Sequence, residues 1–383
     1  MSSVLLVFFC QATIFSYLLL KNGISENKKD SKWLAAFVIL GALYICPFML
    51  GYAGWYSETV GYHEFMFFVP FQQLFLIGPV FFFYVKTLLN KNFKLSRIDY
   101  LHFLPAILYL IYSLIVFITD KFILEEFYFY ADGKDKDLDL WYQMAGLISM
   151  LLYLLLSLRH YFNYRNLSLQ EVSFADEIAF KWIKHFIIAF SIILVLRVLF
   201  FILNPEWWEF GRKFWHYLCF SILLMYISIT GYINTIKASI KLDANLFLEL
   251  EPALNEKSEA PRNEPEKGLV LDEWKDKITH LFDGEAVHKN PNLTLTDLAN
   301  TLNTNRNIIS KAINQEFQMN FNDFVNEKRA EAVIEKLKNG EHAQNTLLGI
   351  ALDCGFNSKT TFNRAFKKHT GITPKQFITK NQL

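Results

Sequence analysis

The sequence predicts an all-α protein in two parts, a bundle of seven membrane-spanning helices followed by a smaller, polar helical domain. Three observations predict this class. Apolar runs of roughly 17–22 residues, the length that spans a bilayer, recur over about the first 240 residues. Hydrophobic residues make up 52% of the 383 residues and include 38 phenylalanines, which is too apolar for an ordinary soluble protein. The rest of the chain is polar, with apolar residues at helical spacing.

The apolar runs define a predicted membrane domain over residues 1–236. We expect seven spans, at Val4 to Leu20, Trp33 to Tyr52, Phe65 to Val85, Tyr100 to Thr119, Trp141 to Leu158, Trp182 to Leu203, and Trp215 to Ile236. The first run lacks the basic region and the small-residue cleavage site of a signal peptide, so we expect it to be retained.

Basic residues mark alternate loops between these spans. They follow the first, third and fifth spans: Lys21, Lys28, Lys29, Lys32, Lys86, Lys91, Lys94, Arg97, Arg159, Arg165 and Lys181. Gly54 to Glu64 has no lysine or arginine, and Asp120 to Leu140 is mainly acidic. Because lysine and arginine concentrate in cytoplasmic loops, we expect the N-terminus outside and the C-terminus inside. The predicted location is the inner, cytoplasmic membrane of the cell, crossed several times.

A few polar side chains fall inside the predicted spans, where each is unfavourable unless it is paired. Arg197, Gln143 and His216 lie toward the outer half and could line a shared pocket for a small-molecule or peptide signal. Arg197 could equally snorkel outward or pair inside the bundle. The acidic loop from Asp120 to Leu140 could bind a cation or a peptide, although a run of charges is more often a solvated surface.

The sequence gives little support for enzyme chemistry. Cys10, Cys46, Cys219 and Cys354 lack the paired spacing of zinc or redox sites. Phosphate-binding glycine loops, metalloprotease and serine hydrolase motifs are also missing from the sequence. We therefore expect no enzyme activity, no cofactor and no metal.

A predicted linker covers residues 237–268. Its segment from Glu251 to Lys267 contains Pro252, Pro261 and Pro265 among alternating charges, a composition that buries too little apolar surface to fold. Such a tether transmits proximity between domains better than orientation.

Residues 269–383 read as two helix-turn-helix units. In the first, Leu295, Leu298 and Leu302 form a buried stripe, and Asn305 caps a helix with a polar outer face. The outer residues are Arg306, Asn307, Ser310, Lys311 and Asn314. In the second unit, a turn at Gly355 leads to a helix capped by Ser358, with Phe362 and Phe366 facing inward. Its other face holds Lys359, Thr360, Thr361, Asn363, Arg364 and Lys367. A helix with one aromatic and one basic side suits the DNA major groove.

These residues resemble the signature of AraC-type transcription regulators over roughly 110 residues, about one small domain. The resemblance rests on Gly355-Phe356-Asn357-Ser358, Phe362, Arg364, Phe366-Lys367 and Gly371-Ile372-Thr373-Pro374, and upstream on Leu295 to Ala299 and Arg306 to Phe317. Asn303 and Gln318 depart from it, since each stands where a glycine is common. The resemblance implies that Asn307, Ser310 and Lys311 read one DNA half-site, and that Lys359, Thr360, Asn363 and Arg364 read another.

The predicted function is that of a membrane-embedded transcription regulator that couples a signal at the spans to promoter binding. Expected partners are double-stranded promoter DNA, the lipid bilayer, a second copy of the chain and, for an activator, RNA polymerase. Two alternatives stay open: a membrane enzyme or transporter with an autoregulatory DNA-binding tail, and a regulator whose helices only anchor it. The signal, the operator and the direction of regulation do not follow from the sequence.

Overall fold

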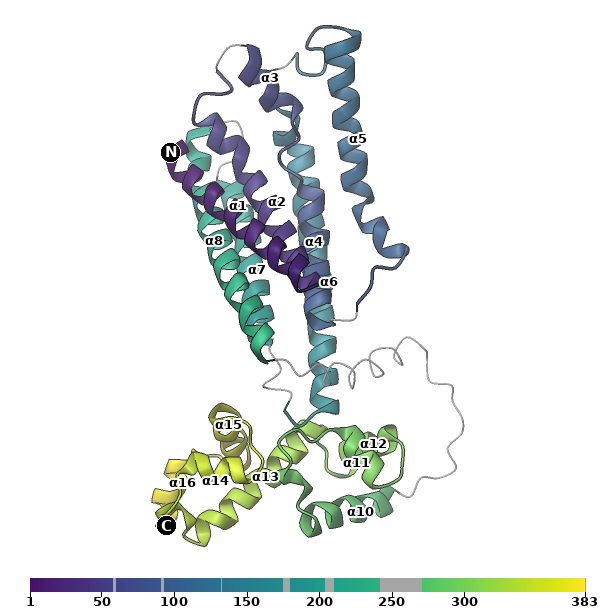
Figure 1. Cartoon of the computed structure of the whole chain (residues 1–383), viewed down its shortest axis with the longest axis vertical. Coiled ribbons are helices and arrows are strands. Elements are labelled where there is room, and N and C mark those ends of the chain that lie inside the picture. The colour runs from purple at the N-terminus through teal and green to yellow at the C-terminus, as the bar shows by residue number, and fades with distance from the viewer. Residues whose placement is uncertain are drawn as a thin grey trace. The chain divides into compact units, whose positions relative to one another are not determined.

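The computed structural model describes residues 1–57, 60–90, 93–131, 133–174, 180–203, 210–241 and 271–382. Every element named in these ranges is a helix or helical turn, so the predicted all-α class is confirmed. The chain forms two compact units: the membrane unit, residues 1–161 and 181–243, and the reader unit, residues 162–180 and 244–383. Figure 1 shows their helices.

Long apolar helices build the membrane unit. They are α1 (Ser2–Ser25), α2 (Lys29–Gly51), α3 (Val60–Phe68), α4 (Leu74–Leu89), α5 (Leu104–Ile118), α6 (Leu140–Glu171), α7 (Phe180–Leu203) and α8 (Phe210–Lys241). Shorter turns are η1 (Ile98–Phe103), the π-helical η2 (Thr119–Ile123) and η3 (Lys136–Leu138). At the α2–α8 contact a Cβ on Gly41 would lie 2.7 Å from Leu224 Cδ1, so a larger residue there would displace the Leu224 side chain.

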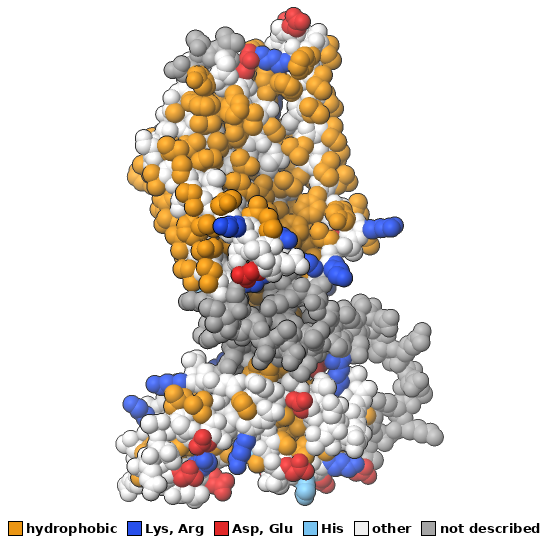
Figure 2. Space-filling view, in the orientation of Figure 1, with side chains coloured by type: hydrophobic (Ala, Val, Ile, Leu, Met, Phe, Trp, Pro, Cys, Tyr) orange, Lys and Arg blue, Asp and Glu red, His pale blue; other side chains and the backbone are white. Residues whose placement is uncertain are grey.

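The membrane unit exposes many large hydrophobic side chains on its surface. Val7, Leu155 and Trp215 are 67%, 67% and 61% exposed, while Phe81 and Phe186 stack with ring centroids 5.0 Å apart in the core. Figure 2 shows hydrophobic side chains over most of the visible face of this unit. Helices that are hydrophobic on all sides are typical of membrane spans, because a soluble protein exposes no apolar surface of this extent.

Six described helical segments are long and apolar enough to cross a membrane. The third predicted span, Phe65 to Val85, is instead divided between α3 and α4 by an irregular stretch that contains Pro70. In α4, 16 residues extend roughly 24 Å, less than the hydrocarbon thickness of about 30 Å. The count of seven spans therefore stays a prediction.

The helix α6 is longer than the sequence suggested. It has 32 residues, roughly 48 Å, where the fifth span was expected to end at Leu158. Its residues from Phe162 onward belong to the reader unit. One continuous helix therefore contributes to both units.

In the reader unit the order is α10 (Leu271–Gly284), η4 (Val287–Lys289), α11 (Leu295–Thr301), α12 (Arg306–Glu316), α13 (Phe321–Lys338), η5 (Glu341–Ala343), α14 (Leu347–Asp353), α15 (Lys359–Thr370) and α16 (Pro374–Asn381). It has two hydrophobic cores, and α13 supplies both. Phe321, Phe324 and Val325 pack in the first core, and Val333 and Leu337 in the second. The predicted linker at 237–268 lies almost wholly outside the described residues.

Candidate nucleic-acid interface

Capping residues set the ends of the first helix-turn-helix unit. Thr294 caps α11 in a capping box, since its Oγ1 accepts from Asp297 N at 3.1 Å and Asp297 Oδ2 accepts from Thr294 N at 2.9 Å. Asn305 caps α12 by accepting from Asn307 N at 2.8 Å. The predicted cap at Asn305 is confirmed.

Two residues that depart from the family pattern keep the glycine-like backbone. Asn303 has a φ of 49° and Gln318 a φ of 55°, both in the left-handed region. Asparagine enters this region readily, whereas glutamine does so at a cost. The turn and the exit from α12 therefore keep the geometry that a glycine would give.

The polar face of α12 points away from the first core. Ile309, Ala312 and Ile313 are fully buried, whereas Asn307, Lys311 and Asn314 are exposed. Ser310 is half-buried, and Arg306 lies 4.0 Å from the carboxylate of Glu171. The structure thus places these five predicted residues along one helix.

The second unit turns at Gly355. Its φ is 91°, and a Cβ there would lie 2.3 Å from the carbonyl oxygen of His288, so the turn packs directly on the loop before α11. Thr346 caps α14 through Gly349 N at 3.0 Å. Ser358 caps α15 through Thr361 N at 3.2 Å, as its position in the sequence predicts.

Most of the predicted residues of α15 share an exposed face: Lys359, Thr360, Asn363, Arg364 and Lys367. Thr361 does not share the exposed face on which the sequence placed it. It is only 5% exposed, and its Oγ1 accepts from Ser358 Oγ at 3.1 Å. It lies in the capped first turn on the buried side of α15, with Phe362 and Phe366, and its contact with DNA stays a prediction.

An open groove runs along this face. It has a volume of about 840 Å³ and is lined by Lys359, Asn363, Arg364, Lys367 and Lys375, among others. The first residues of α14, α15 and α16 also border it, through Leu347, Lys359 and Pro374. Helix N-termini and basic side chains both favour phosphate, so the groove suits a polyanion.

Arg329 has a structural position. Its side chain is only 1% exposed. Its guanidinium donates to His288 O at 2.9 Å, to Asn290 O at 2.7 Å and to Ser173 Oγ at 3.1 Å. A buried cation with these carbonyl partners positions a loop.

The predicted signal-pocket residues do come together in the membrane unit. Arg197 Nη2 donates to Gln143 Oε1 at 2.8 Å and to Gln143 O at 3.1 Å. His216 Nε2 lies 3.1 Å from Tyr44 Oη, and Arg197 stacks on the Tyr44 ring at 5.5 Å. The cavity that Arg197 and His216 share has about 10 Å³ of room, enough for one water at most. Arg197 and Gln143 are thus paired inside the bundle, and Tyr44 connects His216 to Arg197.

The acidic loop is partly buried, contrary to its interpretation as a solvated surface. Asp135 is 5% and Asp137 is 4% exposed. Tyr56 donates to Asp135, Tyr109 Oη donates to Asp137 Oδ1 at 2.5 Å, and Gln72 N donates to Asp137 Oδ2 at 2.9 Å. Hydrogen bonds from other elements therefore make this loop part of the bundle.

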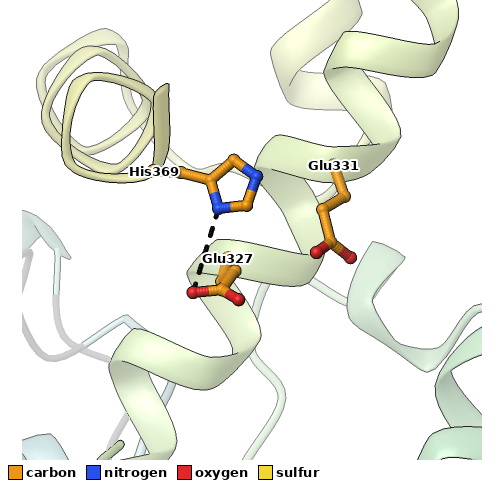
Figure 3. A group of neighbouring side chains, drawn as sticks. All are labelled: Glu327, Glu331 and His369. Atoms are coloured by element: carbon orange, nitrogen blue, oxygen red, sulfur yellow. Dashed lines mark ion pairs between the residues drawn. The ribbon is translucent and has the colours of Figure 1, made fainter. Parts of the chain in front are cut away.

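Glu327, Glu331 and His369 form a group with possible metal-ligand atoms within 4.8 Å of one another (Figure 3). His369 Nδ1 is 3.9 Å from Glu327, and Lys328 Nζ pairs with Glu331 at 2.9 Å. Each glutamate thus has a partner close by, so we interpret the group as a contact between α13 and α15.

Comparisons with known proteins agree with this geometry. A family model described as a helix-turn-helix domain matches residues 298–380, which confirms the AraC-type resemblance for that segment. Uncharacterized HTH-type transcriptional regulators of Staphylococcus aureus strains COL, MSSA476 and N315 are each 31% identical over 113 residues. The similarity covers 28% of this chain and 15% of each relative. No solved structure matches significantly.

The buried acids predict a pH-dependent membrane unit. Burial raises the pKa of Asp137 from 3.8 to about 6 and that of Asp135 well above its usual range. A raised pKa means that the protonated acid stabilises the fold below pH 3.8, and that this contribution is lost as pH rises through about 6. This pKa shift corresponds to a change of at most roughly 3 kcal/mol in the contribution of Asp137 to the free energy of unfolding.

The measurement is the thermal unfolding temperature of the detergent-solubilised chain at pH values from about 4 to about 8. This range covers about four units around these pKa values. Asp137→Asn should remove part of the loss of stability that occurs as pH rises, because the amide mimics the protonated acid. Glu126→Gln, at an exposed acid of the same loop, is the matched control. Equal pH slopes for the unaltered chain and Asp137→Asn would contradict the assignment.

Proposed function

We propose that this protein is a membrane-embedded, sequence-specific DNA-binding transcription regulator. The observation that carries the proposal is the reader unit, in which α13 joins two capped helix-turn-helix units with polar and basic outer faces. The helix-turn-helix match over residues 298–380 supports DNA as the partner. The apolar surface of the membrane unit supports a bilayer as its surroundings.

Each reading helix has a separate role in the proposal. Asn307, Ser310 and Lys311 of α12 would read one half-site. Lys359, Thr360, Asn363 and Arg364 of α15 would read a second half-site about one helical turn away. Lys367 and Lys375, on the groove beside α15, would hold phosphates.

The proposed orientation is an outer N-terminus and a cytoplasmic reader in the inner membrane. The alternation of basic and acidic loops supports it. The membrane unit would receive the signal, and the paired network of Arg197, Gln143 and His216 would change partners when it does. A ligand larger than one water would have to open that network, because its cavity has about 10 Å³.

Topology is tested first. A reporter fused after Lys241 should be active only in the cytoplasm, and a reporter inserted near Asp135 should be active only outside, since basic residues stay on the cytoplasmic side. Fusions after Ser25, which should be cytoplasmic, provide the control. An external reporter signal after Lys241 would end the proposal, because chromosomal DNA would be out of reach.

Specificity is tested with a matched pair on α15. Arg364→Ala should weaken the binding free energy for the preferred DNA site by roughly 1–3 kcal/mol, because a bidentate arginine–guanine contact is removed. The variant should also discriminate less between bases at the contacted position. Lys367→Ala should weaken all sequences alike and lower the salt dependence, because it removes a phosphate contact. The measurement is enrichment of duplexes from a random pool by the full chain. An unchanged base preference in Arg364→Ala would refute the assignment of α15.

A further inference from the structure

The cytoplasmic end of α6 is built into the reader unit. Residues 162–180 cluster with 244–383 rather than with the spans. Directly after α6, Val172 pairs with Thr294 in an antiparallel β-bridge, and Ser173 N donates to Leu293 O at 3.1 Å. The segment after α6 is therefore hydrogen-bonded, as in a short antiparallel strand pair, to the residues directly before α11.

Two side chains of α13 secure the same segment. Asn322 Nδ2 donates to Ser173 O at 2.8 Å, and Arg329 Nη2 donates to Ser173 Oγ at 3.1 Å. Val172 is 1% and Ser173 0% exposed, and Asn322 is 1% exposed. Buried polar groups with satisfied hydrogen bonds indicate a specific docking site.

The docked segment reaches the first reading helix, α12. Glu171, the last residue of α6, lies 4.0 Å from Arg306, the first residue of α12. Segment 162–174 thus approaches the start of α12, the helix that carries the proposed DNA-contacting residues Asn307, Ser310 and Lys311.

The chemistry at α12 is that of a phosphate substitute. Arg306 at the start of α12 is a cation that could meet a DNA phosphate, and here a carboxylate, that of Glu171, lies 4.0 Å from it. An acid in that place also repels DNA phosphates. We infer that the end of α6, residues 162–174, is an inhibitory element that competes with DNA for the reading helix α12, an inference that rests on the proposed function. Movement of α6 would then release the reader.

A disulfide between Val172 and Thr294 tests this. Residues directly opposite in an antiparallel pair have Cα atoms about 4.5–5.5 Å apart, within disulfide range, so Val172→Cys with Thr294→Cys should cross-link on oxidation. The full chain is placed in lipid nanodiscs and assayed, oxidised and reduced, against a duplex that it enriches from a random pool. Val172→Cys alone and Thr294→Cys alone are the controls, because they show any disulfide formed with one of the four native cysteines.

The oxidised protein should bind the duplex at least about ten-fold more weakly than the same protein reduced, because the lock removes the binding-competent state. Glu171→Gln should bind about three- to ten-fold more tightly than the unaltered chain, because an acid is removed from the DNA side. Equal binding in both redox states, failure to cross-link, or a Glu171→Gln variant that binds no better would overturn the inference alone. If neither state enriches any duplex, the proposed function fails and the inference fails with it.

Discussion

The buried guanidinium of Arg329 is the interaction on which the reader unit depends. It lies near the middle of α13, the helix that supplies both cores, and it is among the largest fully buried side chains described. Its bonds to His288 O and Asn290 O shape the loop that precedes α11. That loop in turn packs against Gly355, the turn of the second unit. Removing such a buried charge would leave its carbonyl partners unpaired.

This arrangement links three parts of the chain that are distant in sequence. Arg329 contacts the loop of the first unit and, through Ser173, the end of α6. At the start of α6, Gln143 bonds with Arg197, and its Nε2 donates to Asp137 O at 2.6 Å. A single helix therefore has a buried polar network near one end and a docking segment at the other. A signal that alters the first network would act on the same helix whose last residue, Glu171, pairs with Arg306 of α12.

Local features of the reader could be predicted from sequence. The caps at Asn305 and Ser358 and the inward stripe of Phe362 and Phe366 are confirmed, because each depends on residues within one or two turns. Thr361 was misplaced although it is also local. A polar side chain in the first turn of a helix can face either the solvent or the core, and its residue type does not show which. Here Thr361 faces inward, where its hydroxyl bonds with the capping Ser358.

Long-range features could not be predicted. The polar face of α6 beyond Leu158 looked like a cytoplasmic loop, because nothing in its own sequence shows that Asn322 and Arg329, about 150 residues later, bind its end. The acids Asp135 and Asp137 looked solvated, because their tyrosine and backbone donors come from other helices. The break in the third predicted span did have a local signal, the proline at position 70. The length of the apolar run nevertheless favoured the prediction of one continuous span.

Hydrogen–deuterium exchange at the amide of Ser173 tests the central claim most directly, because this amide bonds to Leu293 O only while α6 is docked. The full chain in nanodiscs is compared with and without a saturating duplex enriched from a random pool. The account predicts slow exchange without DNA and markedly faster exchange with DNA, as the segment leaves the reader. Protection that stays the same or increases on DNA binding would show that docking and DNA binding are compatible, and would contradict it.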